Sequence, residues 1–581
     1  MKQKSKGKLL LLSLAMAVYG VGANSGHAAA ADPPWPGMYE NDGRTPHTIH
    51  MSNSKTGSTL NLVTQYGANT ADSAADDAAK IRAAIAAAKA GDEIYLPNGT
   101  YNLNSPDPND TSTHFQLKSG VNIRGESQLG VVLKSNFDNT DKTSSPITSY
   151  VMRGKGVNNV YLKNFSITSI WNKTYSSDST TSNPDAGGPN HGIQILYDST
   201  TSNKSYNVTI DRITIEKFKN NAIKITRAQD VVVQNCTIKN ATDVGGGGAG
   251  YGIVLEGTYH EDHIGQNDDS ARNVAQNNTI LGPYIRHGVL LQNYTHNNVI
   301  RNNTITNSAI DAIDLHGEDE YLNEVYANTI TGVSRGGGVG LGNSGGTTYI
   351  HDATGSYNYI HDNVIDSSKY GVWVLFDTPD TTIERNTIRN FYKVSNSSGI
   401  YLGKAPRTII RSNLIDGNGA TGFWGIHLAG DSGTGTSTAG NPDYTDIINN
   451  KVTGNSGGIK ITAGSGVELG GNTVSGNTTN TSYSVAVGSI APDAIPPSPP
   501  SGLQATTVGK TRVTLSWTAG TGANRYLIYA GSTLVGTTEG QTSYEVVNLL
   551  TGTNYSFTIM GSDNGGNLSA ASNALTVTTL Q

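Results

Sequence analysis

Titratable side chains gather in one stretch of this 581-residue chain, from Lys224 to Glu318. Cations, histidines, a tyrosine and carboxylates occur together there, and such groups transfer protons and stabilise developing negative charge. They lie in or beside short apolar segments that begin with Gly or Ala, so equivalent positions return along the stretch. The residues are Lys224, Arg227, Tyr251, Glu256, Arg286, His287, Asp311, Asp314, His316 and Glu318.

Elimination at an acidic sugar is the first reaction that this mixture suggests. Cations neutralise a uronate carboxylate, which lowers the barrier to removal of the proton on carbon 5. A Tyr or His then serves as base, and a second group protonates the leaving glycosidic oxygen. The sequence therefore favours β-elimination on an acidic polysaccharide.

Hydrolysis is the main alternative, because the stretch also contains many carboxylates. It needs two of them across the bond, about 5–5.5 Å apart for retention or about 6.5–9.5 Å apart for inversion. Asp311, Asp314, Glu318 and Glu256 could supply such a pair. The run 311–320 could equally hold Ca²⁺ through oxygen ligands or form a solvated rim, and the candidate metal ligands are Asp311, Asp314 and Glu318.

A repeated phrase, Asn-Thr-Ile or a close variant, predicts the elements that position these groups. The closest copies are 22 to 27 residues apart. Such a period indicates a solenoid, in which one coil cannot bury its apolar side and must stack on the next. We expect the Asn side chains to form an amide ladder that satisfies the turns. The phrase begins at Asn235, Asn278, Asn303, Asn328, Asn363, Asn386, Asn413, Asn450 and Asn472.

The Gly/Ala-led segments read as parallel strands that stack side by side. Their second and fourth residues are Ile, Val or Leu, as inward positions should be, so the third and fifth face outward. The segments are Gly192–Asp198, Ala222–Ala228, Gly252–Thr258, Gly288–Tyr294, Ala312–Glu318, Gly338–Ser344, Gly371–Asp377, Gly399–Ala405, Gly425–Asp431 and Gly458–Gly464.

This alignment places the titratable residues on one outward face. Adjacent strands lie about 4.8 Å apart, so four coils bring these groups within about 15 Å along a groove. Aromatic side chains on later coils offer flat surfaces for sugar rings. The residues that we expect to bind substrate are Arg227, Glu256, Gln292, His316, Trp373 and Tyr401.

Composition sets further bounds. The formal net charge of −6 is too small to indicate nucleic acid as a partner. Basic residues precede the apolar stretch Leu9–Val21 and the small-residue run Ala28–Ala30, which predicts a secretory signal peptide. Cys236 is the only cysteine, which excludes disulfides within the chain, and we expect it to be a small buried hydrophobe.

The segment 60–101 resembles the entry of secreted right-handed parallel β-helix enzymes of the pectate-lyase-like superfamily. It holds an Ala-rich amphipathic helix, Asp76–Ile85, between two strand patterns. In that superfamily the helix covers the open end of the solenoid. The resemblance implies the same cap here, because a stack of coils would otherwise expose its core.

The stretch from Arg286 to Asn303 looks like the Arg-His-Gly coil of alginate carbon-5 epimerases, and chondroitinase-B-like and alginate-lyase β-helices carry a similar motif. The resemblance implies that Arg286 binds a substrate carboxylate and that His287 lies beside the reacting sugar. The chain lacks the Asp-Pro-His-Asp/Glu motif of the epimerases and the lyase Lys one coil upstream. The residues expected to be catalytic are Arg286, His287, Tyr251 and Lys224, and the base stays open among the last three.

The C-terminal region changes composition after the Pro-rich linker Ala491–Pro500. The short strand patterns that follow resemble a fibronectin type III domain, in which Trp517 matches the core Trp of strand B. Leu550 and Tyr555 match the tyrosine corner. The resemblance suggests a spacer or a weak carbohydrate-contacting appendage.

These patterns together predict an all-β chain: signal peptide 1–31, irregular segment 32–58, right-handed parallel β-helix catalytic domain 59–489, linker 490–500 and fibronectin type III domain 501–581. The leading function is a secreted, extracellular, monomeric lyase acting on an alginate- or pectate-like polysaccharide. Calcium is the one cofactor considered, and neither nucleic acid nor membrane is expected as a partner. A paired-carboxylate hydrolase, a carbon-5 epimerase and a non-catalytic sugar binder remain alternatives.

Overall fold

The computed structural model describes most of the chain beyond the N-terminal segment. The expected signal peptide, residues 32–54, part of the inserted loop 259–272 and the linker residues 491–494 lie outside the described residues. The described ranges are 55–73, 75–138, 148–245, 247–258, 266–342, 355–391, 397–419, 422–432, 439–490, 495–523, 525–538, 540–546, 549–563 and 567–581.

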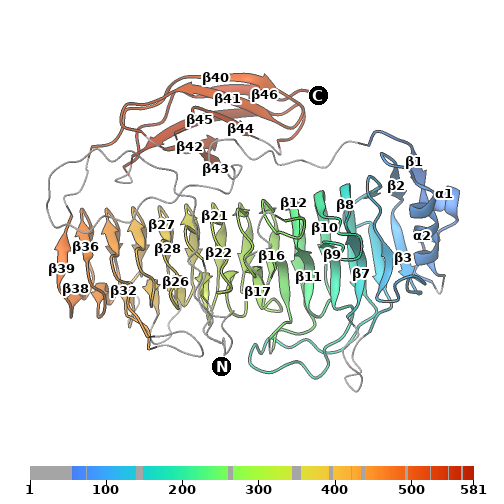
Figure 1. The fold of residues 1–581 in the computed structure, drawn as a ribbon, viewed down its shortest axis with the longest axis horizontal. Helices are drawn as coiled ribbons and strands as arrows, with labels where there is room; N and C mark the ends of the chain where they lie inside the picture. Colours follow the sequence, from blue (N-terminus) through green and yellow to red (C-terminus); the bar gives the residue numbers. More distant parts are fainter. Residues whose placement is uncertain are drawn as a thin grey trace, which may run out of the picture.

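The N-terminal part of the described chain is a parallel β solenoid with three walls (Figure 1). The groove wall is one parallel sheet, and its strands confirm the Gly/Ala-led pattern, although most begin one residue earlier and end sooner than predicted. Its strands are β4 Thr113–Gln116, β7 Tyr150–Lys155, β9 His191–Leu196, β11 Asn221–Thr226, β14 Tyr251–Glu256, β17 His287–Gln292, β20 Ile313–Leu315, β23 Gly337–Leu341, β26 Tyr370–Val374, β29 Ser398–Leu402, β32 Trp424–Leu428, β35 Gly457–Ile461 and β38 Thr479–Tyr483.

The back wall is formed by the strand that precedes most of the repeated Asn phrases. The long strands β8 and β10 continue from it into the side wall. Its strands are β1 Thr59–Asn61, β2 Glu93–Leu96, β5 Asn122–Gly125, β8 Asn158–Ser169, β10 Ser205–Ile215, β12 Ala228–Gln234, β15 Val274–Gln276, β18 Val299–Arg301, β21 Glu324–Tyr326, β24 Tyr359–His361, β27 Thr382–Glu384, β30 Ile409–Arg411, β33 Asp446–Ile448, β36 Val467–Gly470 and β39 Val487–Ser489.

The side wall carries the Thr-Ile part of the phrase, with Ile side chains such as Ile280 and Ile305 fully buried in the solenoid core. Its remaining strands are β3 Gly99–Leu103, β6 Val131–Ser135, β13 Thr237–Lys239, β16 Thr279–Leu281, β19 Thr304–Thr306, β22 Thr329–Thr331, β25 Val364–Asp366, β28 Thr387–Arg389, β31 Leu414–Asp416, β34 Lys451–Thr453 and β37 Thr473–Ser475.

The expected amide ladder is present at the corner between the back and side walls. The Asn278 amide nitrogen donates to Asn303 Oδ1 at 2.9 Å, and Asn303 donates in turn to Asn328 at 3.0 Å. In the first copy, Cys236 takes the ladder position instead of Asn235, because its backbone nitrogen donates to Asn278 Oδ1. Cys236 is fully buried, and burial raises the pKa of its thiol to about 12, so the expected packing role is confirmed.

Two helices cover the N-terminal end of the solenoid (Figure 1). Helix α2, Asp77–Ala87, is the expected Ala-rich helix, and Ile81 and Ala84 pack into the core of the first coils. A short helix α1, Leu62–Tyr66, follows strand β1 and replaces the rest of the strand pattern there. Asn61 caps it through bonds from the backbone nitrogens of Val63 and Thr64. None of the described helices is long and apolar enough to cross a membrane.

The C-terminal module is a sandwich of two antiparallel sheets. Trp517 lies in its core, and Tyr555 Oη accepts a 2.8 Å bond from the Leu550 backbone nitrogen, as the tyrosine-corner pattern predicts. Its strands are β40 Ser501–Val508, β41 Val513–Thr518, β42 Arg525–Ala530, β43 Thr533–Thr538, β44 Ser543–Val546, β45 Asn554–Ser562 and β46 Leu575–Thr578.

This module packs on the back wall, on the far side of the solenoid from the groove wall (Figure 1). The hydrophobic core of the sandwich is continuous with Val274, Val299 and Tyr326 of β15, β18 and β21. Arg525 of β42 is buried and reaches Glu384 of β27, with 2.9 Å between Nη1 and Oε2. The apolar contacts and the Arg525–Glu384 ion pair attach the module to the solenoid. The sequence suggested a spacer and did not indicate this attachment.

Candidate active site on the groove wall

The pairing register confirms that the expected titratable residues share one face. Lys224 of β11 is followed in register by Val254, Leu290 and Asp314 on successive strands. On another outward row, Tyr251 pairs with His287 at the start of β14 and β17. The parallel register therefore gathers side chains that are up to 90 residues apart in the sequence.

The centre of the face is a buried cluster of His287, Asp311, Asp314 and His316, which we call the His–Asp cluster. His287 Nδ1 lies 3.6 Å from Asp311 Oδ2 and 3.4 Å from Asp314 Oδ2. His316 Nδ1 lies 2.8 Å from Asp314 Oδ2, which is a hydrogen bond. The side chain of His316 is 20% exposed, against 4–6% for the other three, so His316 is the member that faces the groove.

Burial and mutual charge set different protonation states within the His–Asp cluster. Burial lowers the pKa of His287 to about 3 and raises that of Asp311 well above its usual range. Burial also opposes ionisation of Asp314, but the charge and hydrogen bond of His316, together with the nearby His287 and Arg286, outweigh it and lower the pKa of Asp314. The reciprocal attraction raises the pKa of His316 despite burial. The cluster thus combines a neutral imidazole and a neutral carboxyl with a charged His–Asp pair.

Two glutamates lie next to the cluster. Burial raises the pKa of Glu318 to about 8, and the neighbouring Glu320 adds to the effect. Glu320 accepts bonds from the backbone nitrogens of Gly317 and Glu318, and burial raises its pKa well above the usual range. Glu318 therefore holds a proton at neutral pH, unlike an exposed carboxylate.

Arg286 and Tyr251 contact the loops beside the groove. Arg286 Nη1 donates to the carbonyls of Ser179 and Val244, both at 2.8 Å, while its buried Nε has no hydrogen-bond partner among the described residues. Tyr251 Oη accepts from the Gly248 nitrogen at 2.9 Å, and burial raises its pKa. Arg286 thus joins the insertion around Ser179 to the strand face, and its expected bond to a substrate carboxylate stays a prediction.

The expected upstream residues are paired with acids. Lys224 Nζ lies 2.7 Å from Glu256 Oε2, and Arg227 lies 3.7 Å from Asp268 and over the ring of Tyr197. These pairs occupy the coils just before the His–Asp cluster. Gln292 is partly exposed at the end of β17, in register with Glu256.

Aromatic side chains form a platform downstream of the cluster. Trp373 and Tyr370 stack with their centroids 5.0 Å apart, and Tyr401 lies beside Tyr370 at 5.5 Å. Trp373 Nε1 also donates to Asp311 Oδ1 at 3.1 Å. Gly340 makes this possible, because a Cβ there would lie 2.5 Å from Trp373 Nε1. The platform is therefore joined directly to the His–Asp cluster.

The expected calcium ligands fit Ca²⁺ poorly. The atoms that converge within 4.8 Å of one another belong to His287, Asp311 and Asp314, and Glu318 is not part of this set. Ca²⁺ takes six to eight oxygen ligands, whereas this set offers one imidazole nitrogen and two carboxylates. Calcium at Asp311, Asp314 and Glu318 stays a prediction that a calcium titration would test, and we derive no chemical step through it.

The sequence patterns missed two groups of charged residues. Arg153 and Lys155 extend the outward rows onto β7, which begins Tyr-Val instead of Gly or Ala. A second set on the back wall, Tyr359, His361, Glu384 and Arg411, occupies outward positions just before the Asn phrases. The alternation of inward apolar and outward polar residues along those strands would have predicted both groups.

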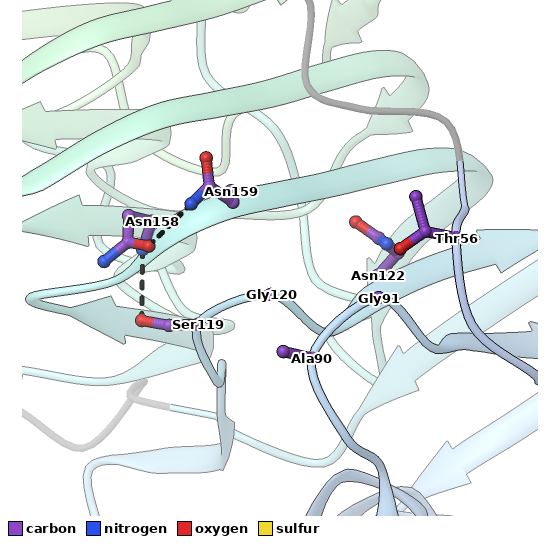
Figure 2. A pocket seen from close by; sticks show the side chains of 8 residues that line it. All are labelled: Thr56, Ala90, Gly91, Ser119, Gly120, Asn122, Asn158 and Asn159. Carbon is purple, nitrogen blue, oxygen red and sulfur yellow. Dashed lines mark hydrogen bonds between the residues drawn. The ribbon is translucent and has the colours of Figure 1, made fainter.

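A separate concavity lies among the N-terminal coils, away from the His–Asp cluster. Its volume is about 440 Å³, and its lining offers small and amide side chains without a titratable group (Figure 2). The lining residues are Thr56, Ala90, Gly91, Ser119, Gly120, Asn122, Asn158 and Asn159. This lining lacks the proton-transfer groups of the groove wall.

Curated relatives match a short part of the chain. Exoglucanase B of Cellulomonas fimi is 43% identical over 114 residues, which is 18% of this chain and 10% of that protein. Chitinase Chi52 of Paenibacillus xylanexedens is 43% identical over 91 residues, 15% of this chain and 17% of that protein. The chain thus spans less than a fifth of the length of either relative.

Solved structures that match 60–76% of this chain have low sequence identity to it. The A-module of mannuronan C-5 epimerase AlgE4 from Azotobacter vinelandii is 17% identical, with 75% of this chain and 100% of that chain covered and a TM-score of 0.45. A GH87 α-1,3-glucanase from Streptomyces thermodiastaticus is 16% identical, with 76% and 70% covered and a TM-score of 0.45. An alginate lyase from Paenibacillus is 15% identical, with 60% and 99% covered and a TM-score of 0.39.

Family comparisons agree with the two architectures in the structure. Residues 191–354 and 262–438 match the family described as a right handed beta helix region. Residues 498–578 match the fibronectin type III domain. The chain is therefore a right-handed β-helix protein with a C-terminal fibronectin type III domain.

Proposed function

We propose that this protein is an enzyme that acts on a polysaccharide, and that it cleaves a uronate-containing chain, alginate-like first, by β-elimination. The observation that carries the proposal is the His316–Asp314 pair, which faces the groove between upstream cations and a downstream aromatic platform. A histidine held by a carboxylate is a common proton-transfer unit. The high identity of a segment of this chain to parts of an exoglucanase and a chitinase supports a polysaccharide as the substrate.

His316 suits the role of base better than His287. The side chain of His287 is nearly enclosed and its pKa is lowered to about 3, so it stays neutral beside the two aspartates. His316 is more exposed, and Asp314 fixes its Nδ1 side. We therefore assign proton transfer to His316, which the sequence had placed among the substrate-binding residues.

In the proposed reaction, His316 takes the proton from carbon 5 of the uronate. The electron pair of that C–H bond forms the double bond between carbons 4 and 5, and the bond from carbon 4 to the glycosidic oxygen breaks. A second group protonates that oxygen. Glu318, which holds a proton at neutral pH, can serve as this acid or bind the substrate carboxylate, and Lys224 and Arg286 add positive charge nearby.

The pH dependence tests the assignment of the base. Neutral His316 is the active form, so the rate rises with pH through its pKa, which is raised above its usual value. Asp314→Asn removes the carboxylate that raises this pKa, so the rising limb moves to lower pH while the maximal rate falls. An unchanged midpoint in this variant would remove His316 from the mechanism.

A glycoside hydrolase is the second candidate, because the carboxyl groups of Asp311 and Asp314 have pKa values displaced in opposite directions. Asp311 weakens this candidate, since its Oδ1 already accepts bonds from Gly337 and Trp373. A substrate panel scored for unsaturated product and for reducing ends separates the reactions. Both signals indicate a lyase, reducing ends alone a hydrolase, and exchange at carbon 5 without either an epimerase.

We also propose that the protein is exported. The charged and apolar pattern of residues 1–31 supports this proposal, and a polymeric substrate would be met outside the cell. Detection of the mature protein in culture medium, with an N-terminus near Ala31, would test it.

A further inference from the structure

We propose that Arg153 and Lys155 on β7 form a subsite for an anionic sugar, upstream of the His–Asp cluster. The proposal rests on the proposed action on a uronate polysaccharide and extends it to a substrate segment remote from the reacting bond. Both residues belong to the outward rows of the groove wall. Arg153 pairs in register with Gln194, which pairs with Lys224, and Lys155 belongs to the row of Glu256.

The two cations of the subsite contact the same carboxylate. Arg153 Nη1 and Lys155 Nζ both contact Asp110 Oδ2, at 3.3 Å and 3.1 Å. Two cations thus share one carboxylate. The next cation along the groove, Lys224, forms its own ion pair with Glu256. Because Arg153 and Lys155 share the Asp110 carboxylate, neither has an acidic partner of its own in these contacts, which favours an anionic ligand.

The guanidinium of Arg153 is held ready for such a ligand. Its Nε donates to Gln194 Oε1 at 2.9 Å, and the group lies 4.5 Å from the ring centroid of Tyr150. Tyr150 is itself supported by His191, with 4.8 Å between their ring centroids. The Nη2 donors have no partner among the described residues, and these contacts reduce the ordering entropy that the side chain would lose on binding a carboxylate there.

The position of β7 sets the length of substrate that reaches it. Five strand steps separate β7 from β20, the strand that contains Asp314, and at about 4.8 Å each they span roughly 24 Å. Several sugar rings cover this distance along the groove. A polymer can contact β7 and His316 together, whereas a short oligomer at His316 cannot.

Affinity for a polyuronate and for an uncharged glucan, measured by affinity electrophoresis of the full-length protein at low ionic strength, tests the subsite. In the double variant Arg153→Gln, Lys155→Gln, we expect about tenfold weaker binding of the polyuronate and little change for the glucan. Asp110→Asn keeps the Oδ1 acceptor for Ser112 but removes the charge, so polyuronate binding strengthens about threefold.

Lys134→Gln is the matched control, because Lys134 forms a similar ion pair, with Asp72 at 2.8 Å, on strand β6 away from the groove wall. The subsite is refuted if the double variant binds polyuronate like the control, or if both polymers lose affinity equally. Charge-dependent binding without unsaturated product would support the subsite and refute the elimination. Formation of unsaturated product, with polyuronate binding unaltered in the variants, would support the elimination and refute the subsite.

Discussion

Two clusters of buried ionisable residues lie on opposite walls of the same solenoid, and they are built differently. On the back wall, Glu384 is surrounded by Arg385, Arg411 and Arg525. Burial opposes its ionisation, but the three arginines outweigh burial and lower the pKa of Glu384 well below its usual range. Charge in this cluster is compensated.

The groove wall lacks this compensation. Burial raises the pKa values of Asp311, Glu318 and Glu320, and lowers that of His287, so it favours the neutral form of each. Within the His–Asp cluster, His316 and Asp314 are the pair whose mutual attraction favours their charged forms. Structural ion-pair networks typically shift pKa values toward the charged forms. Groups that transfer protons instead often have pKa values shifted toward their neutral forms by burial. The contrast indicates that the back cluster fastens a domain and the groove cluster performs chemistry.

Replacement of His316 gives the largest effect that we expect. His316→Ala removes the proposed base, so the rate falls about 100- to 10,000-fold, and it also lowers the unfolding free energy because buried Asp314 loses its charged partner. Steady-state kinetics on polyuronate, with thermal melts, measures both. His427→Ala is the control, since His427 lies on the groove wall several strands away, and a comparable loss there would break the distinction.

Replacement of Glu384 should affect stability instead of chemistry. Glu384→Ala leaves three buried arginines without their shared carboxylate, which costs about 3–5 kcal/mol of unfolding free energy. Urea unfolding measures this loss, and activity under native conditions should persist. As a control, Asp380→Asn breaks a more exposed pair with Arg407 and should cost less than about 1 kcal/mol. Similar costs for the two variants would contradict the back-wall interpretation.

Glu318 offers a direct test of whether burial keeps a carboxyl group of the groove wall protonated. Its pKa in the folded protein is about 8, so the folded state keeps a proton that the unfolded chain releases near pH 4.5. Stability from this group is complete below pH 4.5 and is lost as pH rises through 8. Glu318→Gln removes that loss, so relative to the parent it should gain about 1–3 kcal/mol between pH 5 and 9. Unfolding free energies compared across this range would show no relative gain if Glu318 were ionised.

The platform gives the smallest expected effect. Trp373→Ala removes a stacking surface worth about 0.5–1.5 kcal/mol, so KM rises about two- to tenfold. Trp373→Phe keeps a ring but loses the bond to Asp311, so it should restore KM while lowering kcat. An equal effect of both variants on KM would mean that the platform does not contact substrate.

The groove face could be predicted from the sequence because a parallel sheet preserves register. Once Lys224 and Asp314 occupy equivalent positions in their coils, stacking places them on one face. The same logic predicted the Asn ladder, whereas helix α2 followed from its Ala-rich pattern and its capping role from the resemblance to secreted β-helix enzymes. It failed for Arg153, because β7 lacks the Gly/Ala start on which the alignment depended.

The roles within the face could not be predicted, because burial does not follow from a repeat. His287 and His316 are both histidines on neighbouring coils, yet one is enclosed by two aspartates and the other faces the groove. Arg286 looked available for a substrate carboxylate, but loop carbonyls of Ser179 and Val244 accept its bonds. The enclosure of His287 comes from aspartates of the next coil, and the contacts of Arg286 come from loops whose path the sequence pattern does not encode.

The sequence by itself determined the coil, the inward and outward positions and the presence of a C-terminal sandwich, since these follow from local periodicity and turn chemistry. Only the tertiary structure decided that the sandwich is fixed to the back wall through Arg525 and Glu384, and that His316 is the exposed member of its cluster. The physical reason is that desolvation and pairing depend on every group packed around a charge, and most of those groups come from distant parts of the chain.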